Sequence, residues 1–370
     1  MPRSCTVAVS RCTRVEGFQS AVTSAATRQH SPMKTLAGID GGGTRTRLAL
    51  ANEDGTLLGY AEGGCCSFVD LGLDTARAEL ARLWAAAWRV AGAEPRPADA
   101  LFMGLGSVLS EADALTNCDL AIQLDFGQHG NVRADNDAWN AHAGGLTGQP
   151  GILLISGTGS ACLGRNESGA TWRAGGWGYL LNDVGSAYAL GHAALIAATR
   201  HADARGEPTS LAEVVRSALN LGDMKEIFRK LHHEGVPRSA IAALAPQVAA
   251  QAEAGDTVAQ EILQENAQGL VEMVVTVARK LDLDEPKLAL TGGLVTNALM
   301  FRQMFLDKLT ARLPGFTLAE SGLPPVLGAV LLACEQVSGS KASLAFQQNL
   351  RASSAPVIGH LQGGCALPSD

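Results

Sequence analysis

Short apolar runs alternate along this chain with longer stripes of helical spacing. Residues 36–40 are an apolar run that predicts a strand, and residues 47–51 alternate polar and apolar positions as a second strand. The turn signal at 52–55 would fold a third strand, 56–61, back onto the second. Apolar positions three and four apart over 74–92 then predict a helix that packs one face on this sheet.

The same pattern starts again further along the chain. Strands are predicted at 101–105 and 131–135, and a helix begins at Asp137. The apolar run 151–155 and the strand 161–165 then repeat the opening succession of strand, turn and strand. This restart predicts two lobes of similar construction. The length of 370 residues agrees, because it exceeds what one core usually organises.

The second lobe is richer in helices. Residues 183–281 are predicted to be mostly helical, and one long helix has an apolar face. That face consists of Leu263, Ala267, Leu270, Val271, Val274 and Ala278. A buried strand is predicted at 287–291, a helix at 294–313, and a last helix, opened by proline, at 325–337. The succession of strands and helices indicates an α/β protein.

Two segments without periodicity flank the predicted lobes, which we place at 33–147 and 148–337, with a helical insertion in the second. Residues 1–32 are rich in Arg and Ser and poor in acids, as in an organellar transit peptide. Alternatively, translation begins at Met33, which we favour, and in both cases we expect no function there. Residues 338–370 are predicted to be a flexible tail.

Composition and charge narrow the class of function. Hydrophobic residues make up 46% and charged residues 18% of the chain, which is typical of a globular protein. The formal net charge of −7 and the lack of a basic stripe argue against a nucleic-acid partner. No apolar run approaches the ~20 residues of a membrane-spanning helix. The eight cysteines include no Cys-x-x-Cys pair, so we expect reduced thiols and a cytoplasmic protein without a structural metal site.

Glycine is abundant, with 42 in the chain, and two clusters fall between paired strands. Glycine lets the backbone approach an anion and turn its amides toward it, so two such turns across a cleft could hold a polyphosphate. Each turn alone is equally well explained as a tight β-turn. No P-loop, Rossmann or nucleophile-elbow motif is present. The clusters are Gly41, Gly42, Gly43 and Thr44 after Asp40, and Gly157, Thr158 and Gly159 after Ser156.

Acid–base chemistry near these turns would need a carboxylate. Asp135, Asn136 and Asp137 lie where a predicted strand ends and a helix begins, a place where a side chain is firmly held and faces a cleft. The alternative for Asp137 is a helix N-cap, because Asp is favoured at that position.

Two further glycine clusters suggest surfaces for small molecules. In the first, glycines around a Trp would leave its ring open to a sugar, with Asp183 close behind; alternatively, the Trp anchors a loop and Asp183 caps the next helix. In the second, Gly292 and Gly293 open a helix where adenine or ribose could lie, or form a plain turn. The first cluster is Gly175, Gly176, Trp177 and Gly178.

These residues carry a resemblance to a known family. The stretches DGGGTRT (40–46), NDAWNA (136–141), LLISGTGSACLG (153–164) and GGWGYLLNDVGSAY (175–188) resemble the N-acetylglucosamine kinase family. That family belongs to the BadF/BadG-type ATPases within the actin-like, sugar-kinase superfamily. TGGL (291–294) and LGAVLLA (327–333) resemble the superfamily's adenosine motif and closing helix. DGGGT is shared across the superfamily, whereas SGTGS followed by GGWG is specific.

The resemblance implies a duplicated ribonuclease-H-like, actin-like ATPase fold: two lobes around a central cleft. It implies an ATP-dependent kinase that phosphorylates N-acetylglucosamine or glucosamine, at the 6-hydroxyl, with Mg²⁺. Asp137 matches the catalytic base, Asp40 the carboxylate that helps to hold Mg²⁺, and the clustered glycines with Thr44 and Thr158 the phosphate loops. Besides Asp137, the sugar would contact Gly176, Trp177, Gly178 and Asp183. The implied partner is a small-molecule amino sugar; a homodimer is left open.

The sequence departs from the family pattern at two places. Where members often carry an Asn-containing segment, residues 64–68 read Gly-Cys-Cys-Ser-Phe, and Ser67 could take part of that role. Val184 stands where a Glu often follows the Asp. The role of Val184, and that of the Cys65–Cys66 pair, cannot be assigned from the sequence.

Two rival functions share the fold. One is an ATP-driven activator of a 2-hydroxyacyl-CoA dehydratase, which would hold an iron–sulfur cluster through cysteines near the second phosphate loop. Only Cys162 lies close to that loop in the sequence. The other is a non-catalytic sugar sensor, against which both glycine turns and Asp137 argue.

Overall fold

Five strands of the first lobe form one mixed sheet in the order β3-β2-β1-β4-β5. The computed structural model describes residues 33–181, 183–320 and 322–363, so the expected extension 1–32 lies outside the described residues. Pairs β1–β2 and β2–β3 are antiparallel, whereas β1–β4 and β4–β5 are parallel. The strands are β1 (Thr35–Gly41), β2 (Thr46–Asn52), β3 (Leu57–Gly63), β4 (Ala100–Leu105) and β5 (Val132–Asp135).

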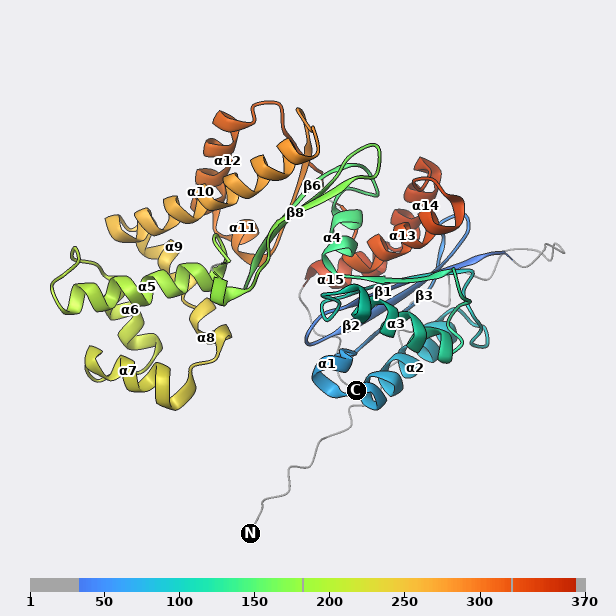
Figure 1. Cartoon of the computed structure of the whole chain (residues 1–370), viewed down its shortest axis with the longest axis horizontal. Coiled ribbons are helices and arrows are strands. Elements are labelled where there is room, and N and C mark those ends of the chain that lie inside the picture. Colours follow the sequence, from blue (N-terminus) through green and yellow to red (C-terminus); the bar gives the residue numbers. More distant parts are fainter. Residues whose placement is uncertain (1–32, 182, 321, 364–370) are drawn as a thin grey trace, which may run out of the picture.

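The second sheet repeats the first, strand for strand. Its order is β10-β9-β6-β7-β8, again with two antiparallel pairs on one side of the first strand and two parallel pairs on the other. The strands are β6 (Gly151–Ser156), β7 (Ser160–Arg165), β8 (Thr171–Gly175), β9 (Lys287–Thr291) and β10 (Thr317–Leu318). The predicted duplication and the two-lobed α/β fold are therefore confirmed, and Figure 1 shows the two lobes side by side.

Helices cover the first sheet on its outer face. α2 (Leu73–Val90) buries Leu80, Leu83, Trp84 and Trp88, as its spacing predicts. The short α1 (Phe68–Leu71) precedes it. α3 (Glu111–Gln123) was not predicted, because few of its residues are buried and its apolar stripe is weak. A capping box between Ser110 and Asp113 begins α3.

Two helices cross between the sheets. α4 (Ala138–Gly145) follows β5, and α13 (Pro325–Ser338) follows β10. α13 packs on the inner face of the first sheet, where a Cβ on Gly38 would lie 2.6 Å from the Val330 nitrogen. It also packs against α4. We expected α13 in the second lobe; it instead belongs to the core of the first lobe, because the chain crosses over after β10.

The C-terminal segment also differs from expectation. Residues 344–353 and 355–363 form α14 (Leu344–Ser353) and α15 (Ala355–Gly363), not a flexible tail. Phe346 and Leu350 are buried in the core that α13 shares with the first sheet. The Ser353 hydroxyl accepts a hydrogen bond from the Leu57 backbone nitrogen at 2.9 Å. This apolar contact and hydrogen bond hold the segment on the first lobe.

Helices of the second lobe surround one face of its sheet. α10 (Thr257–Lys280) buries the whole apolar face that the sequence predicts. The single helix predicted at 294–313 is wrong: it breaks at Ala298, whose ψ of 89° is not helical. The break lets the first part pack on β6 and β9 and the second on α10. The helices are α5 (Ala187–Ala202), α6 (Leu211–Ala218), α7 (Ile227–Arg229), α8 (Arg238–Ala242), α9 (Ala245–Glu253), α10 (Thr257–Lys280), α11 (Gly293–Asn297) and α12 (Leu299–Arg312).

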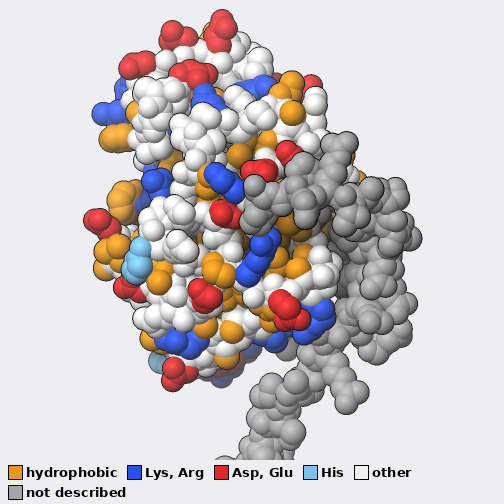
Figure 2. All heavy atoms as spheres, turned by 90° about the vertical axis from the view of Figure 1, so that its right-hand side faces the viewer, with side chains coloured by type: hydrophobic (Ala, Val, Ile, Leu, Met, Phe, Trp, Pro, Cys, Tyr) orange, Lys and Arg blue, Asp and Glu red, His pale blue; other side chains and the backbone are white. Residues whose placement is uncertain are grey.

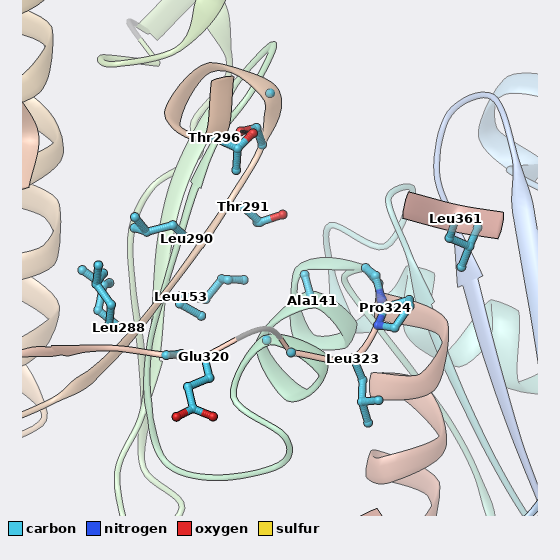
Figure 3. Close-up of a pocket in the computed structure, with 18 of the residues that line it drawn as sticks. Ala141, Leu153, Leu288, Leu290, Thr291, Thr296, Glu320, Leu323, Pro324 and Leu361 are labelled. Carbon is cyan, nitrogen blue, oxygen red and sulfur yellow. Dashed lines mark hydrogen bonds between the residues drawn. The ribbon is translucent and has the colours of Figure 1, made fainter. Parts of the chain in front are cut away.

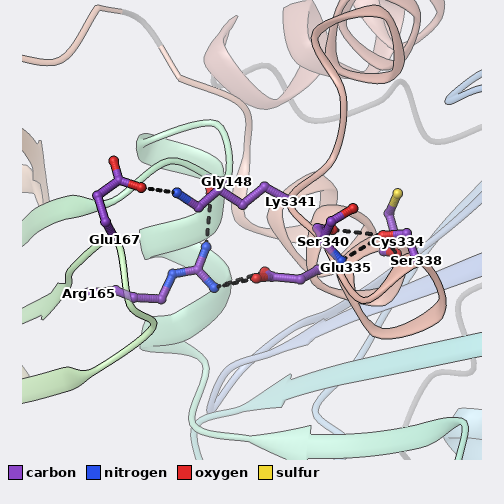
Figure 4. A network of polar contacts seen from close by, with 8 residues as sticks. All are labelled: Gly148, Arg165, Glu167, Cys334, Glu335, Ser338, Ser340 and Lys341. Carbon is purple, nitrogen blue, oxygen red and sulfur yellow. Dashed lines mark hydrogen bonds and ion pairs between the residues drawn. The ribbon is translucent and has the colours of Figure 1, made fainter.

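A polar network joins the lobes (Figure 4). Arg165 of β7 donates two hydrogen bonds to the Glu335 carboxylate of α13, at 2.8 and 3.0 Å, and one to the Gly148 carbonyl. Lys341 forms an ion pair with Glu167 beside it. These contacts tie the second sheet to a helix of the first lobe. A relative movement of the lobes would therefore change these contacts.

Figure 2 shows acidic and basic side chains interspersed over the visible face. Among the described residues, no helix is both long and apolar enough to cross a bilayer.

Candidate active site

The first glycine hairpin joins β1 to β2. Its turn is closed by a hydrogen bond from the Gly42 nitrogen to the Arg45 carbonyl at 2.9 Å. Gly41 is buried against Leu105 and Cys66, whereas Gly43 and Thr44 are exposed. Nothing lies within 4 Å of the place where a Cβ on Gly43 would be, so the tip is open to a ligand.

Asp40, the last residue but one of β1, is largely buried. Its Oδ1 accepts a hydrogen bond from the Asn140 amide at 3.0 Å, and its Oδ2 lies 3.8 Å from the Arg47 guanidinium. Burial raises the pKa of Asp40, against the effect of these two partners. A carboxylate in this position, with another nearby, suits Mg²⁺, which is bound by one or two carboxylates together with substrate phosphates.

Asp137 directly precedes α4 and faces the first hairpin. A Cβ on Gly106 would lie 3.2 Å from Asp137 Oδ2 and 3.7 Å from the Gly41 carbonyl oxygen. Burial, and secondly the charge of Asp40, raise the pKa of Asp137 to about 6. Asp137 makes no side-chain capping hydrogen bond; Asn136 accepts one from the Ala138 nitrogen instead. Asp137 therefore occupies the N-cap position, as the alternative interpretation expected, but its side chain does not cap the helix.

Asn140 belongs to this group, although the sequence did not single it out. Its side chain is fully buried and donates to Asp40 and to the Ile39 and Gly104 carbonyls. The signal was its position three residues after Asp137, which places both on neighbouring positions of one helix. Asn140 fixes the Asp40 carboxylate relative to the helix that Asp137 begins.

The second glycine hairpin joins β6 to β7. Ser156 and Ser160 at its two ends donate to the Gly185 and Val184 carbonyls at 2.6 and 2.7 Å, which ties the hairpin to the turn before α5. Thr158 at the tip is exposed. Gly292 packs against the same hairpin: with a φ of +102°, a Cβ there would lie 2.7 Å from the Gly157 nitrogen.

A cavity of about 470 Å³ opens beside the second hairpin. It brings together three residues that the sequence predicted as nucleotide contacts, Gly157, Thr158 and Gly293. Alanines of α8 and α9 form much of the remaining wall, with Glu253 and Asn297 as polar residues. Its position and small side chains suit a nucleoside.

A larger cavity, of about 690 Å³, lies between the lobes. It extends from Thr291 and Gly292 on the second lobe to Arg47 on the first, past Ala141 of α4. Figure 3 shows Thr291 and Thr296 on one side of this cavity and Pro324 on the other. The first hairpin does not line either cavity. Neither of these two cavities therefore brings the two hairpins together.

The loop after β8 presents the predicted sugar surface. Trp177 is 72% exposed, and its ring lies 5.2 Å from the Arg173 guanidinium carbon, so it does not anchor the loop to the core. Asp183 is buried and accepts a hydrogen bond from the Gly178 nitrogen at 2.9 Å. The cap of α5 is Ser186, not Asp183. Both alternative interpretations, a Trp that anchors the loop and an Asp183 that caps the next helix, are therefore wrong.

A family model for the "BadF/BadG/BcrA/BcrD ATPase family" matches residues 37–333. The chain belongs to this family. It is 31% identical over 303 residues to an N-acetylmuramic acid/N-acetylglucosamine kinase of Clostridium acetobutylicum, covering 81% of this chain and 98% of that one. An N-acetyl-D-glucosamine kinase of Dictyostelium discoideum is 29% identical over 308 residues, with 80% and 96% covered.

Solved structures agree with the family fold. A candidate N-acetylglucosamine kinase from Chromobacterium violaceum superposes with a TM-score of 0.62 at 29% identity, covering 81% of this chain and 99% of that one. A ROK hexokinase from Thermus thermophilus, at 18% identity and a TM-score of 0.55, shares the fold; 83% and 100% of the chains are covered.

The structure shows what surrounds the residues at which the sequence departs from the family pattern. Ser67 is buried and caps α1, its hydroxyl accepting a hydrogen bond from the Asp70 nitrogen at 3.3 Å; a contact with sugar stays a prediction. Cys66 packs beside Gly41, and burial raises the pKa of its thiol to about 11, so it is an inert packing residue. Val184 packs against Gly269 of α10, which explains an apolar residue there.

Cys162, on which the activator hypothesis depends, lies inside the second lobe. Its thiol is fully buried in the core, and burial raises its pKa. The side chain therefore points into packed helices and not toward a surface that a shared cluster could occupy. Among the described residues, no group of three or more His, Cys, Asp or Glu side chains could hold a metal ion.

Proposed function

We propose that this family member is an ATP-dependent kinase of amino sugars, N-acetylglucosamine or glucosamine, acting at the 6-hydroxyl. One observation carries the proposal: Asp137 is a partly buried carboxylate beside the first glycine hairpin that makes no capping hydrogen bond, and its pKa is raised to about 6. A carboxylate poised near neutral pH suits a general base. The kinases of similar sequence support the choice of sugar.

In the proposed reaction, Asp137 accepts the proton of the sugar hydroxyl while the sugar oxygen bonds to the γ-phosphorus of ATP. The bond from that phosphorus to the bridging oxygen breaks, and ADP leaves. Backbone amides of the two hairpins would hold the phosphates, with Thr44 and Thr158 as further donors. Because the hairpins lie on different lobes, catalysis would require the lobes to close on both substrates.

Asp40 is the residue that would hold Mg²⁺, with Asn140 fixing its carboxylate. When bound, Mg²⁺ would neutralise charge on the β- and γ-phosphates. The sugar would rest against Gly176, Trp177 and Gly178, whose backbone Asp183 orders. The adenosine would lie in the 470 Å³ cavity beside Gly293, with Gly292 behind the hairpin.

The assay for this function measures ADP release by the full chain with Mg²⁺ and ATP, against a panel of amino sugars and plain hexoses. We expect release to depend on an amino sugar, and phosphorus NMR of the product to place the phosphate on the 6-oxygen. ATP hydrolysis that is indifferent to every sugar would contradict the proposal and favour an activator or a sensor.

The raised pKa of Asp137 predicts an acidic limb in the pH profile. Below pH of about 6 the carboxyl is protonated and cannot accept the hydroxyl proton, so the rate falls about tenfold per pH unit. The rate is measured with both substrates below saturation, so that it reports the free enzyme. A limb that appears only near pH ~4, the ordinary range of an aspartate, would contradict the assignment of Asp137 as the base.

A further inference from the structure

One cation beside the second glycine hairpin has no role so far. Arg238 is the first residue of α8, in the helical insertion of the second lobe. A Cβ on Gly159 would lie 3.3 Å from Arg238 Nη2 and 2.9 Å from Asp183 Oδ2. The guanidinium and the carboxylate that orders the sugar loop therefore both lie beside the hairpin assigned to phosphate.

Aromatic rings hold Arg238 in this place. Its guanidinium carbon lies 5.4 Å from the centre of the Tyr179 ring, and Tyr179 contacts Tyr188 edge to face at 5.0 Å. The Tyr188 nitrogen donates to the carbonyl of Thr158, the hairpin tip, at 3.4 Å. The arginine is thus linked through two rings to the loop it faces, which limits the conformations it can adopt.

Apart from its contact with the Tyr179 ring, the guanidinium of Arg238 keeps its hydrogen-bond donors free in the described part of the chain. Within the described residues, the guanidinium makes no ion pair and no hydrogen bond, whereas Arg47 on the first lobe is paired with Glu62 and Asp40. The first lobe contributes two carboxylates to the site, and ATP adds further negative charge. A guanidinium with free donors next to a phosphate loop matches what phosphoryl transfer requires, since its planar donors fit phosphate oxygens.

We propose that Arg238 contacts the transferred phosphoryl group and stabilises its charge in the transition state. This inference rests on the proposed kinase function and adds a residue to it. It also gives the helical insertion a function, because α8 brings a cation next to the second glycine hairpin, which has no cationic side chain of its own. The contact would form as the lobes close and the phosphates enter the second hairpin.

The alternative source of negative charge is the sugar itself. A carboxylate substituent, as on N-acetylmuramic acid, could reach the same guanidinium. The position of Arg238 beside Gly159, a residue of the hairpin and not of the sugar loop, favours the phosphoryl group. A neutral sugar distinguishes the two, because it lacks the carboxylate but receives the same phosphoryl group.

The test compares Arg238→Gln and Arg238→Lys with Arg229→Gln in the full chain. Arg229 belongs to the same insertion and is an exposed cation that pairs with Glu234, so its variant has the same change of charge. The substrate is the neutral sugar that the wild-type protein phosphorylates fastest. We expect Arg238→Gln to lower kcat about 100-fold, with KM for the sugar nearly unchanged, and Arg238→Lys to keep part of the rate.

A kcat for Arg238→Gln within threefold of that of Arg229→Gln would overturn the assignment. A loss confined to N-acetylmuramic acid would overturn it too, and would make Arg238 a reader of the sugar carboxylate. Thermal unfolding of each variant separates a fold defect from a loss of charge, and Arg238→Lys keeps the site occupied by a cation. If the wild-type protein releases no ADP with any sugar, the kinase proposal fails first, independently of Arg238.

Discussion

Asp137→Asn is expected to lower the turnover of sugar by about 10³-fold, within the range that general-base catalysis contributes. Asparagine keeps the size of the side chain but cannot accept a proton from the attacking hydroxyl. Because Asp137 makes no capping hydrogen bond, α4 should begin at the same place in the variant. The loss should therefore appear in kcat, while KM for ATP and for the sugar change little. Initial rates of ADP release over a matrix of both substrates measure the two separately.

Asp119→Asn on α3 is the matched control. It removes the same charge from an exposed position of the first lobe and should leave turnover unchanged. The unfolding temperature of Asp137→Asn should not fall, and should rise if anything, because the substitution removes a partly buried carboxylate that is repelled by Asp40. Turnover near the wild-type rate in Asp137→Asn would mean that another group accepts the proton, and the assignment of the base would be wrong.

The duplicated sheet could be predicted from sequence because its signals are local. Glycine clusters mark both hairpins, and alternation of polar and apolar residues marks the strands on either side. The buried face of α10 follows from helical spacing in the same way. In each case the residues that decide the structure are neighbours in the chain.

The parts that were missed depend on contacts between distant segments. Nothing near α13 in the sequence shows that it crosses to the first sheet, because its apolar face would fit either lobe. α14 buries only Phe346 and Leu350, too few for a clear stripe, and is held by β3 and its preceding turn. The tail prediction failed because these partners lie about 300 residues earlier.

The same distinction, between local sequence signals and contacts of distant segments, applies to the candidate active site. Sequence motifs contain Asp40, Asp137 and the hairpin glycines, so these residues could be predicted from the sequence. Asn140 acquires its role only when α4 packs against β1 and β4, and Arg238 only when the insertion folds back over the second hairpin. Long-range packing, not local pattern, completes the site.

The crossing of α4 and α13 predicts the largest effect on stability. Gly328 of α13 lies against α4, where a methyl group would overlap the Asn140 carbonyl oxygen and lie 2.5 Å from the Gly144 nitrogen. Because both neighbours are backbone atoms, they cannot turn away, and the helices would have to separate. We expect Gly328→Ala to lower the free energy of unfolding by about 3 kcal/mol, the upper range for overpacking a core.

Gly359→Ala on α15 provides a control of opposite sign. Nothing lies within 4 Å of that position, so alanine should be neutral there or raise helix stability by up to about 1 kcal/mol. Calorimetric unfolding of both variants measures the contrast. Gly328→Ala should also lose activity, because separating the helices moves the Asn140 amide away from Asp40 and shifts the start of α4, where Asp137 lies. Equal unfolding temperatures for the two variants would show that the crossing can relax, and that the alignment of the two carboxylates does not depend on it.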